Sequence, residues 1–496
     1  MSSIPSLPQL PSGLSHLLDA NLAPSPVDAA AIRRLISDCA TRHDAIVARV
    51  QALQKEIDDL VVERQRTEDY RERLRGIVSP LRGFPPEMLS EVFSHCNTVS
   101  GRSFAPWHLG QVCGVWREVA LRLPTLWTHF NLFWIEGNSY IPPPELVDEQ
   151  LSRSTNAPLS IYIHLDGDLE LEDDFDACVT RLVAHSARWS ALDFYSSPTD
   201  AERFLTLIAP IKDHLDILCS LSFEVARDEL VEAPSFTSHV FASAPLLRRV
   251  HVWFEDGWFF GLPWSNITHI SGDLSSVMVH EMWNRAHQLV VCELDCSGSD
   301  EHVCTADMVY VLPHLTRLSV EYEPTGLEML SAPKLRSLDT VGAAEPPLRL
   351  LRNSPSPNCT LVTLDLMYCE ISESLIDLLR AVPALENLRL RAAVPRRLLP
   401  LIELFRQLLL PNPGICACLS RLLFADDEET DDTEQARAFT DALCSRIGTL
   451  RFVRTFSRNA AVNSRLFDAC GLVEAGMDVR MVGWSEFVDL PVALDD

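Results

Sequence analysis

The chain has 496 residues, which indicates several domains, because compact domains usually hold about 100 to 200 residues. Hydrophobic residues make up 47% and charged residues 22%, a composition that excludes a chain disordered throughout. The 42 basic and 69 acidic residues give a formal net charge of -27, which repels phosphate backbones and anionic lipid surfaces. We therefore expect no nucleic acid and no membrane among the partners.

Residues 1–30 are predicted to be a disordered leader, since they hold several prolines and show no apolar periodicity. They contain no basic segment followed by an apolar core, and no stretch of the chain reaches the roughly 18 apolar residues of a membrane span. The 14 cysteines include no C-x-x-C pair, and several alternate with Leu and Val as small core residues do. These features favour a soluble protein of the reducing cytoplasm, the nucleus or both.

Residues 31–76 predict one long helix with a heptad seam. Apolar residues recur there in alternating steps of four and three, and no Gly or Pro interrupts them before Gly76. The seam is apolar in its first half and polar beyond Leu60, so one interpretation is a coiled-coil homodimer through residues 32–60. The other is a long helix that folds back on the protein's own body. The apolar half of the seam consists of Ile32, Ile36, Cys39, His43, Ile46, Val50, Leu53, Ile57 and Leu60.

Residues 80–130 predict three short helices that form a small bundle. Pro85 and Pro86 can precede or open a helix, and the apolar residues after them lie on one stripe. After a polar loop from Asn97 to Ser103, apolar residues again recur at helical spacing as far as Ala120. So short a bundle buries too little surface to be stable alone, and it should lean on a neighbour or a partner.

Five short motifs follow one another in this region: Phe84-Pro85-Pro86-Glu87-Met88, Val92-Phe93, Val112-Cys113, Trp116-Arg117 and Leu126-Trp127. In this order they resemble the F-box, whose members carry a Leu-Pro-x-Glu-Leu opening, an Ile-Phe pair, a Val-Cys-x-x-Trp-Arg core and a closing Leu-Trp. The resemblance implies docking to a Skp-type adaptor and, through it, to a cullin. The residues that it assigns to the adaptor contact are Phe84, Pro85, Pro86, Glu87, Met88, Leu89, Val92, Phe93, Leu109, Val112, Cys113 and Trp116.

From residue 159 to residue 490 the chain repeats itself, after a linker and first-repeat cap at 131–158. The segment Leu361-Val-Thr-Leu-Asp-Leu-Met-Tyr-Cys-Glu-Ile371 fits the leucine-rich-repeat template L-x-x-L-x-L-x-x-C-x-L, and looser copies lie near the expected period of about 20 to 29 residues. One of them reads Val291-x-x-Leu294-x-Cys296. The others start at Trp189, Leu218, Leu247, Ile267, Leu315, Leu335, Leu385, Leu419 and Leu450.

Each repeat is predicted to be a short strand followed by a turn and a helix or irregular return. The expected fold class is therefore α/β: a long N-terminal helix or coiled coil, the three-helix F-box, and an irregular leucine-rich-repeat solenoid, an α/β horseshoe. Strand alternation places every second residue on the concave, solvent-facing side, where an unidentified protein substrate would bind. These residues are Arg249, His251, Trp253, Glu293, Asp295, Arg317, Glu321, Asp339, Asp365, Arg389 and Arg391.

No group of residues has the spacing of a catalytic site or a metal site. His280 and His287 are too far apart for the two ligands of a zinc protease helix, and Leu171 stands where a calcium loop needs Gly. A zinc set around Cys296 is disfavoured because that residue occupies a core position of a predicted repeat. We therefore expect a protein that is not an enzyme and that holds no cofactor and no metal.

An F-box followed by leucine-rich repeats resembles the substrate-recognition subunit of an SCF-type cullin-RING E3 ubiquitin ligase. The resemblance implies that the bundle docks the adaptor while the repeats hold the target protein. The alternative is a leucine-rich-repeat interaction scaffold outside any ubiquitin ligase, in which the bundle caps the first repeat of the solenoid.

Overall fold

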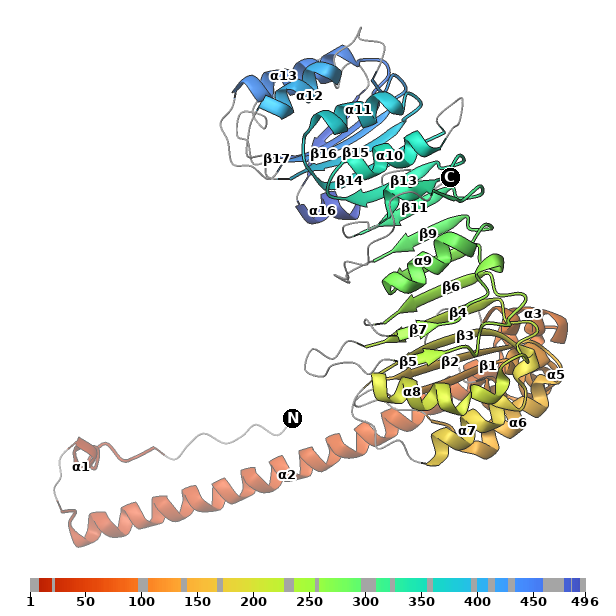
Figure 1. Cartoon of the computed structure of the whole chain (residues 1–496). Coiled ribbons are helices and arrows are strands. Elements are labelled where there is room, and N and C mark those ends of the chain that lie inside the picture. The colour runs from red at the N-terminus through yellow and green to blue at the C-terminus, as the bar shows by residue number, and fades with distance from the viewer. Residues whose placement is uncertain are drawn as a thin grey trace. The chain divides into compact units, whose positions relative to one another are not determined.

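A computed structural model of the protein divides the chain into two compact units, Met1–Leu89 and Ser90–Asp496 (Figure 1). The division falls inside one helix, α3 (Pro86–Cys96). The structure describes residues 9–19, 23–96, 106–134, 141–166, 173–226, 236–254, 258–295, 309–321, 326–354, 360–393, 399–408, 415–426, 433–457, 477–482 and 484–490.

The first unit is dominated by α2 (Pro26–Ile77), a single helix of 52 residues. Ser25 caps it by accepting a hydrogen bond from the Asp28 amide, and Pro26 fits the first helical turn because that turn needs no amide donor. The long helix is thus confirmed, and it begins inside the segment expected to be a disordered leader. A short helix, α1 (His16–Asp19), and the 3-10 turn η1 (Pro80–Gly83) complete the unit with the first residues of α3.

The second unit starts with the remaining turns of α3 and with α4 (Trp107–Val112), α5 (Gly114–Arg122) and the 3-10 turn η2 (Pro124–Trp127). A parallel sheet of 14 strands follows, and its strand order repeats the order of the strands in the chain. The strands are β1 (His129–Trp134), β2 (Leu159–Leu165), β3 (Trp189–Ser196), β4 (Ser220–Val225), β6 (Arg249–Trp253), β8 (His269–Asp273), β9 (Val291–Leu294), β11 (Arg317–Val320), β13 (Ser337–Val341), β14 (Thr363–Cys369), β15 (Asn387–Ala392), β16 (Arg421–Asp426), β17 (Phe452–Ser457) and β18 (Asp478–Met481).

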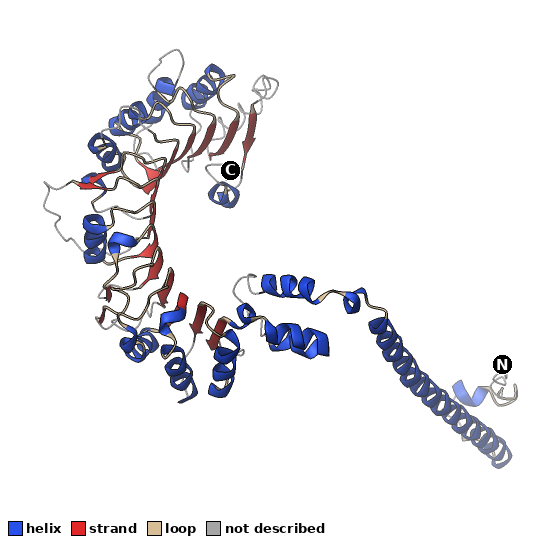
Figure 2. Cartoon of the chain, turned by 90° about the vertical axis from the view of Figure 1, so that its right-hand side faces the viewer, coloured by secondary structure: helices blue, strands red, loops and turns tan. Residues whose placement is uncertain are grey.

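Figure 2 shows the strands lining the inner side of this second unit and the connecting helices on its outer side. The helices are α6 (Pro144–Ser154), α7 (Asp173–Val183), α8 (Pro198–Leu207), α9 (Ser276–Arg285), α10 (Glu345–Asn353), α11 (Glu373–Ala381), α12 (Leu399–Leu408) and α13 (Thr433–Ser445). Shorter connections contain 3-10 turns and the small parallel pairs β5 (Phe236–Ser238) with β7 (Trp258–Phe260) and β10 (Tyr310–Val311) with β12 (Leu330–Ser331). The predicted α/β class, with a long N-terminal helix, is confirmed.

One continuous apolar row across all 14 strands explains why the sheet forms. Neighbouring strands place these residues directly beside one another, and all but the half-buried Val479 are buried in the core. The row consists of Phe130, Ile161, Leu192, Leu221, Val250, Ile270, Cys292, Leu318, Leu338, Leu364, Leu388, Leu422, Val453 and Val479.

The register corrects the phase of one predicted repeat. Cys292 pairs with Ile270 and with Leu318, so the unit runs from Leu289 through Cys292 to Leu294 and does not start at Val291. Leu289, Cys292 and Leu294 are buried, whereas Val291 is half-buried. The shift of two residues keeps strand alternation unchanged, so Glu293 and Asp295 stay on the predicted side. Cys296 lies outside the described residues.

The sheet also extends beyond the predicted repeats. Its first strand, β1, lies at residues 129–134, in the region expected to hold the end of the bundle and a linker, and it pairs in register with β2. At the other end β18 pairs with β17, and the short helix α16 (Trp484–Asp489) follows it. Neither terminal strand carries a full copy of the template, which is why the sequence pattern did not reveal them.

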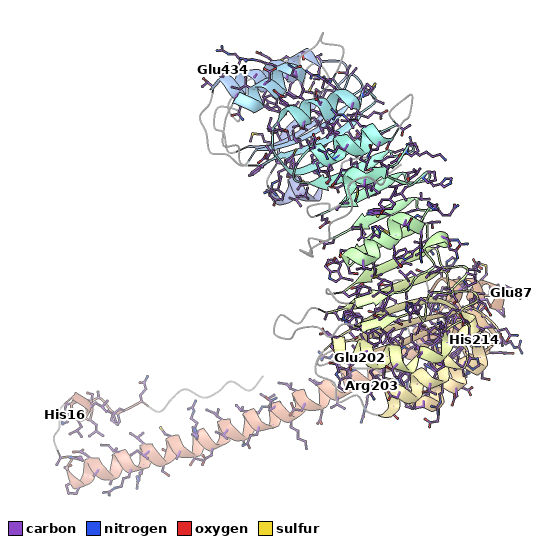
Figure 3. The ribbon with its side chains drawn as sticks, in the orientation of Figure 1. His16, Glu87, Glu202, Arg203, His214 and Glu434 are labelled. Carbon is purple, nitrogen blue, oxygen red and sulfur yellow. The ribbon has the colours of Figure 1, made fainter. Side chains whose placement is uncertain are left out.

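Ion pairs join helices of neighbouring repeats on the outer side. A guanidinium nitrogen of Arg203 in α8 lies 2.9 Å from a carboxylate oxygen of Asp176 in α7, and Arg406 in α12 lies 2.8 Å from Glu434 in α13. Figure 3 labels Arg203 and Glu434. Side chains of the first pair are half-buried and those of the second are exposed, so each pair adds little to stability compared with the apolar row. Within the described part of the chain, every helix is too short or too polar to cross a membrane.

Gly272 in β8 lies where two neighbouring strands approach each other closely. Its φ is +113°, and a Cβ at this position would lie 1.8 Å from the carbonyl oxygen of Val252 in the adjacent strand. We expect Gly272→Ala to destabilise the protein by more than about 3 kcal/mol, since it combines a forbidden backbone conformation with a backbone clash. Chemical denaturation followed by circular dichroism measures the loss.

Gly114→Ala is the matched control. Gly114 opens α5, its φ is not in the left-handed region, and nothing lies within 4 Å of a Cβ built there. This variant should stay within about 1 kcal/mol of the wild type. Equal unfolding midpoints for the two variants would contradict the close strand approach at Gly272.

Candidate interaction surfaces

The helix α3 separates its apolar residues onto two faces. Leu89 and Phe93, four residues apart, are buried, with 2% and 1% of their surface exposed. Met88 and Val92, also four residues apart, keep 52% and 47% exposed. Residues at this spacing share one face of a helix, so α3 has an apolar stripe in the protein interior and a second apolar stripe in solvent.

The helices α4 and α5 show the same division. Leu109, Val119 and Ala120 are buried, and the indole of Trp116 meets the ring of Phe93 edge-on at 5.1 Å between centroids. Val112 and Val115, in contrast, expose 59% and 51% of their surface. Cys113 between the two helices is exposed as well.

A cluster of Trp107, Trp127 and Arg153 joins these helices to the start of the sheet. The indole nitrogen of Trp127 donates a hydrogen bond of 2.8 Å to the carbonyl of Ala120. Arg153 of α6 lies over both Trp107 and Trp127, 4.5 Å from each ring centroid. Gln150 of α6 donates to the carbonyl of His129, the first residue of β1. These contacts join α4 and the residues after α5 to α6, the helix that follows β1.

The twelve residues expected to contact an adaptor therefore fall into three groups. Leu89, Phe93 and Leu109 belong to the interior, and Phe84 and Trp116 are half-buried. The exposed ones, which are available to a partner, are Pro85, Pro86, Glu87, Met88, Val92, Val112 and Cys113; Figure 3 labels Glu87 near the start of α3.

The side of the sheet opposite the helices is called the concave face below. Its central row crosses all 14 strands and is polar almost throughout, in contrast to the apolar row one residue away. The central row consists of Asn131, Tyr162, Asp193, Ser222, His251, Ser271, Glu293, Ser319, Asp339, Asp365, Arg389, Leu423, Arg454 and Arg480.

At β2 to β8 the concave face is open and mixes aromatic, imidazole and carboxylate groups. His251 places Nε2 3.2 Å from a carboxylate oxygen of Glu224 and Nδ1 2.8 Å from the hydroxyl of Ser271. The hydrogen bond with His251 holds the pKa of Glu224 below its usual value. The rings of His164 and Tyr195 stack 4.4 Å apart. Glu224, His164 and Tyr195 were not among the predicted concave residues. Alternation applied to the repeats at Trp189 and Leu218 would have found Tyr195 and Glu224, whereas His164 lies in β2, before the first predicted repeat.

Most of the predicted concave residues between β6 and β13 do reach solvent. Arg249, Arg317 and Glu321 are exposed, and the other members of this stretch are half-buried. Arg317 lies 3.1 Å from Glu293 on the neighbouring strand. Those half-buried members are His251, Trp253, Glu293, Asp295 and Asp339.

The expectation of a solvent-facing concave side is wrong for Asp365, Arg389 and Arg391, which expose only 4%, 8% and 8% of their surface. The reason is that the chain returns to this side after β18. Phe487 of α16 is fully buried, packs with Leu423, and has its ring centroid 5.8 Å from the guanidinium carbon of Arg389. Alternation along one strand cannot reveal such a long-range cover.

Asp365 and Arg389 form a buried ion pair, with 3.0 Å between the carboxylate oxygen and the guanidinium nitrogen. Burial, and then the neighbouring carboxylate of Asp339, raise the pKa of Asp365 to about 7 despite the attraction of Arg389. Burial likewise raises the pKa of Asp339, which stands beside Asp365 in the central row.

Further arginines on the concave side of β15 to β17 stack on aromatic rings. The guanidinium carbon of Arg391 lies 3.6 Å from the ring centroid of Tyr368, and those of Arg421 and Arg454 lie 4.0 and 3.8 Å from that of Phe452. Arg421 and Arg454 were not predicted as concave residues. Their positions next to Leu422 and Val453 in the repeat template carry the signal that would have identified them.

Four of the described cysteines, Cys178, Cys292, Cys369 and Cys416, are buried, and four, Cys39, Cys113, Cys418 and Cys444, are exposed. The thiols of Cys178, Cys369 and Cys416 are buried, and burial raises their pKa to about 11, 12 and 12, so they remain protonated at neutral pH. Across the ranges that the structure describes, no three His, Cys, Asp or Glu side chains are grouped so as to hold a metal ion.

Comparison with known proteins gives no assignment: no model of a known protein family matches the chain, and no curated protein matches it.

The pH dependence of stability tests the environment of Asp365. Its pKa is about 7 in the folded protein against 3.8 for an ordinary Asp, so between these values the folded state binds more protons than the unfolded state. The protonated Asp365 carboxyl contributes its full stabilisation below pH 3.8, the pKa in the unfolded state. This contribution is lost as the pH rises through the pKa of about 7 in the folded state. Between pH 5 and 7, the free energy of unfolding of wild type should fall by up to about 1.4 kcal/mol per pH unit relative to that of Asp365→Asn.

Urea unfolding of both proteins at several pH values measures this difference. The comparison with Asp365→Asn cancels the contribution of the other carboxylates. A difference between the two proteins that stays constant across the range would show that Asp365 titrates normally.

Proposed function

We propose that this protein is an F-box-type substrate receptor. In this proposal the short helices dock a Skp-type adaptor and thereby join a cullin-RING ubiquitin ligase, and the concave face binds the protein to be modified. The observation that carries the proposal is the exposure of the apolar side chains of Met88 and Val92 in α3 and Val112 in α4, next to buried residues of the same region.

Exposed apolar residues in adjacent short helices are typical of a surface that a partner covers. Met88, Val92 and Val112 each leave about half of their surface in water, although nearby residues of the same helices are fully packed. The sequence could keep these positions polar without loss to the interior. A partner with an apolar docking surface would gain the free energy of burying them.

The repeats support the second half of the proposal. A solenoid offers a long surface on which many residues of a target can be contacted at once, and the concave face between β2 and β13 is open and carries groups of both charge signs. A receptor of this kind needs no catalytic group. It acts by raising the concentration of its target near the ubiquitin-carrying enzyme.

One observation favours the alternative, a repeat scaffold outside any ligase. Trp127, Arg153 and Gln150 tie the helices to α6 and to β1, which is what a cap of the first repeat would do. Capping alone, however, gives no reason for Met88 and Val92 to be apolar. Adaptor binding decides between the two readings.

Val112→Asp should abolish retention of a purified Skp-type adaptor without unfolding the protein, because the side chain is exposed and points a charge at an apolar partner. We expect the dissociation constant to rise by roughly 30-fold or more, as for a central interface residue. Pull-down and calorimetry with the full chain measure it.

Val277→Asp serves as the control, since Val277 in α9 is equally exposed, at 55%, and lies outside the motifs. It should bind the adaptor as wild type does. If wild type fails to bind an adaptor that established F-box proteins retain, the proposed function is rejected. That result would favour the interpretation as a repeat scaffold outside any ligase.

We further propose that α2 joins two copies of the protein. None of its residues is buried, and the apolar seam stays in solvent, with 58% of Val50, 41% of Leu53 and 52% of Ile57 exposed. A helix of 52 residues extends about 78 Å, and an apolar stripe along more than half of it is the pattern of a coiled-coil strand.

Light scattering of the full chain tests this pairing. Wild type should show the mass of a dimer, and Leu53→Asp in the seam should shift the mass toward that of a monomer, because two carboxylates would meet in the interface. Ala48→Asp, on the opposite side of the helix from the seam, should leave the dimer intact. A monomeric wild type would exclude the homodimer.

A further inference from the structure

The concave side of the last strands concentrates positive charge in a protein whose net charge is -27. Arg389 on β15, Arg421 on β16 and Arg454 on β17 expose only 8%, 6% and 6% of their surface. Arg389 and Arg454 belong to the central row, separated by Leu423, and Arg421 stands two residues before Leu423 on the same face of β16. These three residues are called the arginine cluster below.

Two of the three arginines have carboxylate partners and one does not. Arg389 pairs with Asp365 at 3.0 Å, and Arg454 pairs with Asp478 at 2.7 Å. Arg421 forms neither an ion pair nor a side-chain hydrogen bond with any residue that the structure describes, and its Nε is buried without an acceptor. Its visible contact is the ring of Phe452, which it shares with Arg454.

An unpaired buried guanidinium beside two others is electrostatically unfavourable. Stacking on Phe452 compensates only part of the lost hydration, because a ring quadrupole attracts a cation far more weakly than a carboxylate does. Burial lowers the pKa of Arg421, and repulsion from Arg454 and Arg389 lowers it further. Asp365 neutralises its neighbour incompletely, since its own pKa is about 7. The cluster therefore lacks negative charge.

The row that contains Arg421 is partly exposed on either side of this residue. Its register neighbours, Asn387 on β15 and Phe452 on β17, are half-buried, and beyond Phe452 the side chain of Asp478 exposes 44% of its surface.

We propose that the arginine cluster binds an oxyanion of the phosphate class, with Arg421 as the residue that the anion pairs with. Guanidinium groups bind phosphate strongly through charge-assisted hydrogen bonds, and the buried Nε of Arg421 is a donor that lacks an acceptor. A doubly charged phosphate also supplies more negative charge than one carboxylate. The arginine cluster lies on β15 to β17, far along the chain from the helices proposed to dock the adaptor. The test of phosphate binding is therefore independent of the test of adaptor docking.

Titration calorimetry of the full chain with sodium pyrophosphate, at constant ionic strength set with sodium chloride, tests the site. Wild type should bind one pyrophosphate with a dissociation constant below about 1 mM, and Arg421→Gln should weaken binding by roughly 10- to 100-fold, the effect of losing a charged hydrogen-bond donor. Arg249→Gln removes an exposed arginine from the concave end of β6 and should leave binding unchanged.

A second titration distinguishes two sources of the phosphate group, a phosphorylated protein segment and a free phosphate compound. A neutral peptide with one phosphoserine, and the same peptide with serine, are titrated into the same proteins. Tighter binding of the phosphoserine peptide than of pyrophosphate assigns the cluster to a phosphorylated protein segment. Tighter binding of pyrophosphate assigns it to a free phosphate compound.

Stability without ligand supplies an independent readout. Removing an uncompensated buried charge should leave the unfolding midpoint of Arg421→Gln equal to or above that of wild type, and pyrophosphate should raise the midpoint of wild type alone. The proposal is overturned if wild type binds no pyrophosphate, or if Arg421→Gln binds it as tightly as wild type. A large destabilisation of Arg421→Gln together with unchanged pyrophosphate binding would mean that Arg421 serves only to pack on Phe452.

Discussion

The fold depends on the contact of each strand with the strands directly before and after it. One strand and its helix cannot bury their apolar side chains alone, and the row from Phe130 to Val479 becomes a core only because 14 strands stand in register. Each terminal strand has a neighbouring strand on one side only, so the apolar residues at both ends of the sheet need another cover. At the first end Trp127 and Arg153 hold helices beside β1, and near the last end Phe487 of α16 packs against β16.

The strands that carry a periodic Leu pattern could be predicted from the sequence, because that pattern is typical of stacked parallel strands. The prediction failed at strands where other residues replace leucine in the pattern. Val291 was taken as the start of a repeat because Cys292, a small thiol, occupies a position that the template gives to leucine. The terminal strands β1 and β18 carry too few template residues to be recognised. Alternation correctly identified the side on which Arg249 and Arg317 lie, but not the burial of Arg389, which depends on residues far along the chain.

Charge is distributed unevenly along the concave face, and the net charge of the chain conceals this. Carboxylates such as Asp193, Glu293 and Asp339 occupy the central row in its first part, whereas Arg389 and Arg454 occupy it near the end. The carboxylates of the central row thus lie toward its beginning and the guanidinium groups toward its end, where α16 covers Arg389.

The agreement between strand order and chain order also affects how the protein is made. Since every strand pairs with neighbours that are close in sequence, the sheet can grow during translation, strand after strand from β1, without waiting for a distant segment. The helix α16 is an exception, because it packs against β16 only after β17 and β18 have been made. Arg389 of β15 thus reaches its final environment only after α16 has been made, and until then a nascent chain presents it to the surrounding solution.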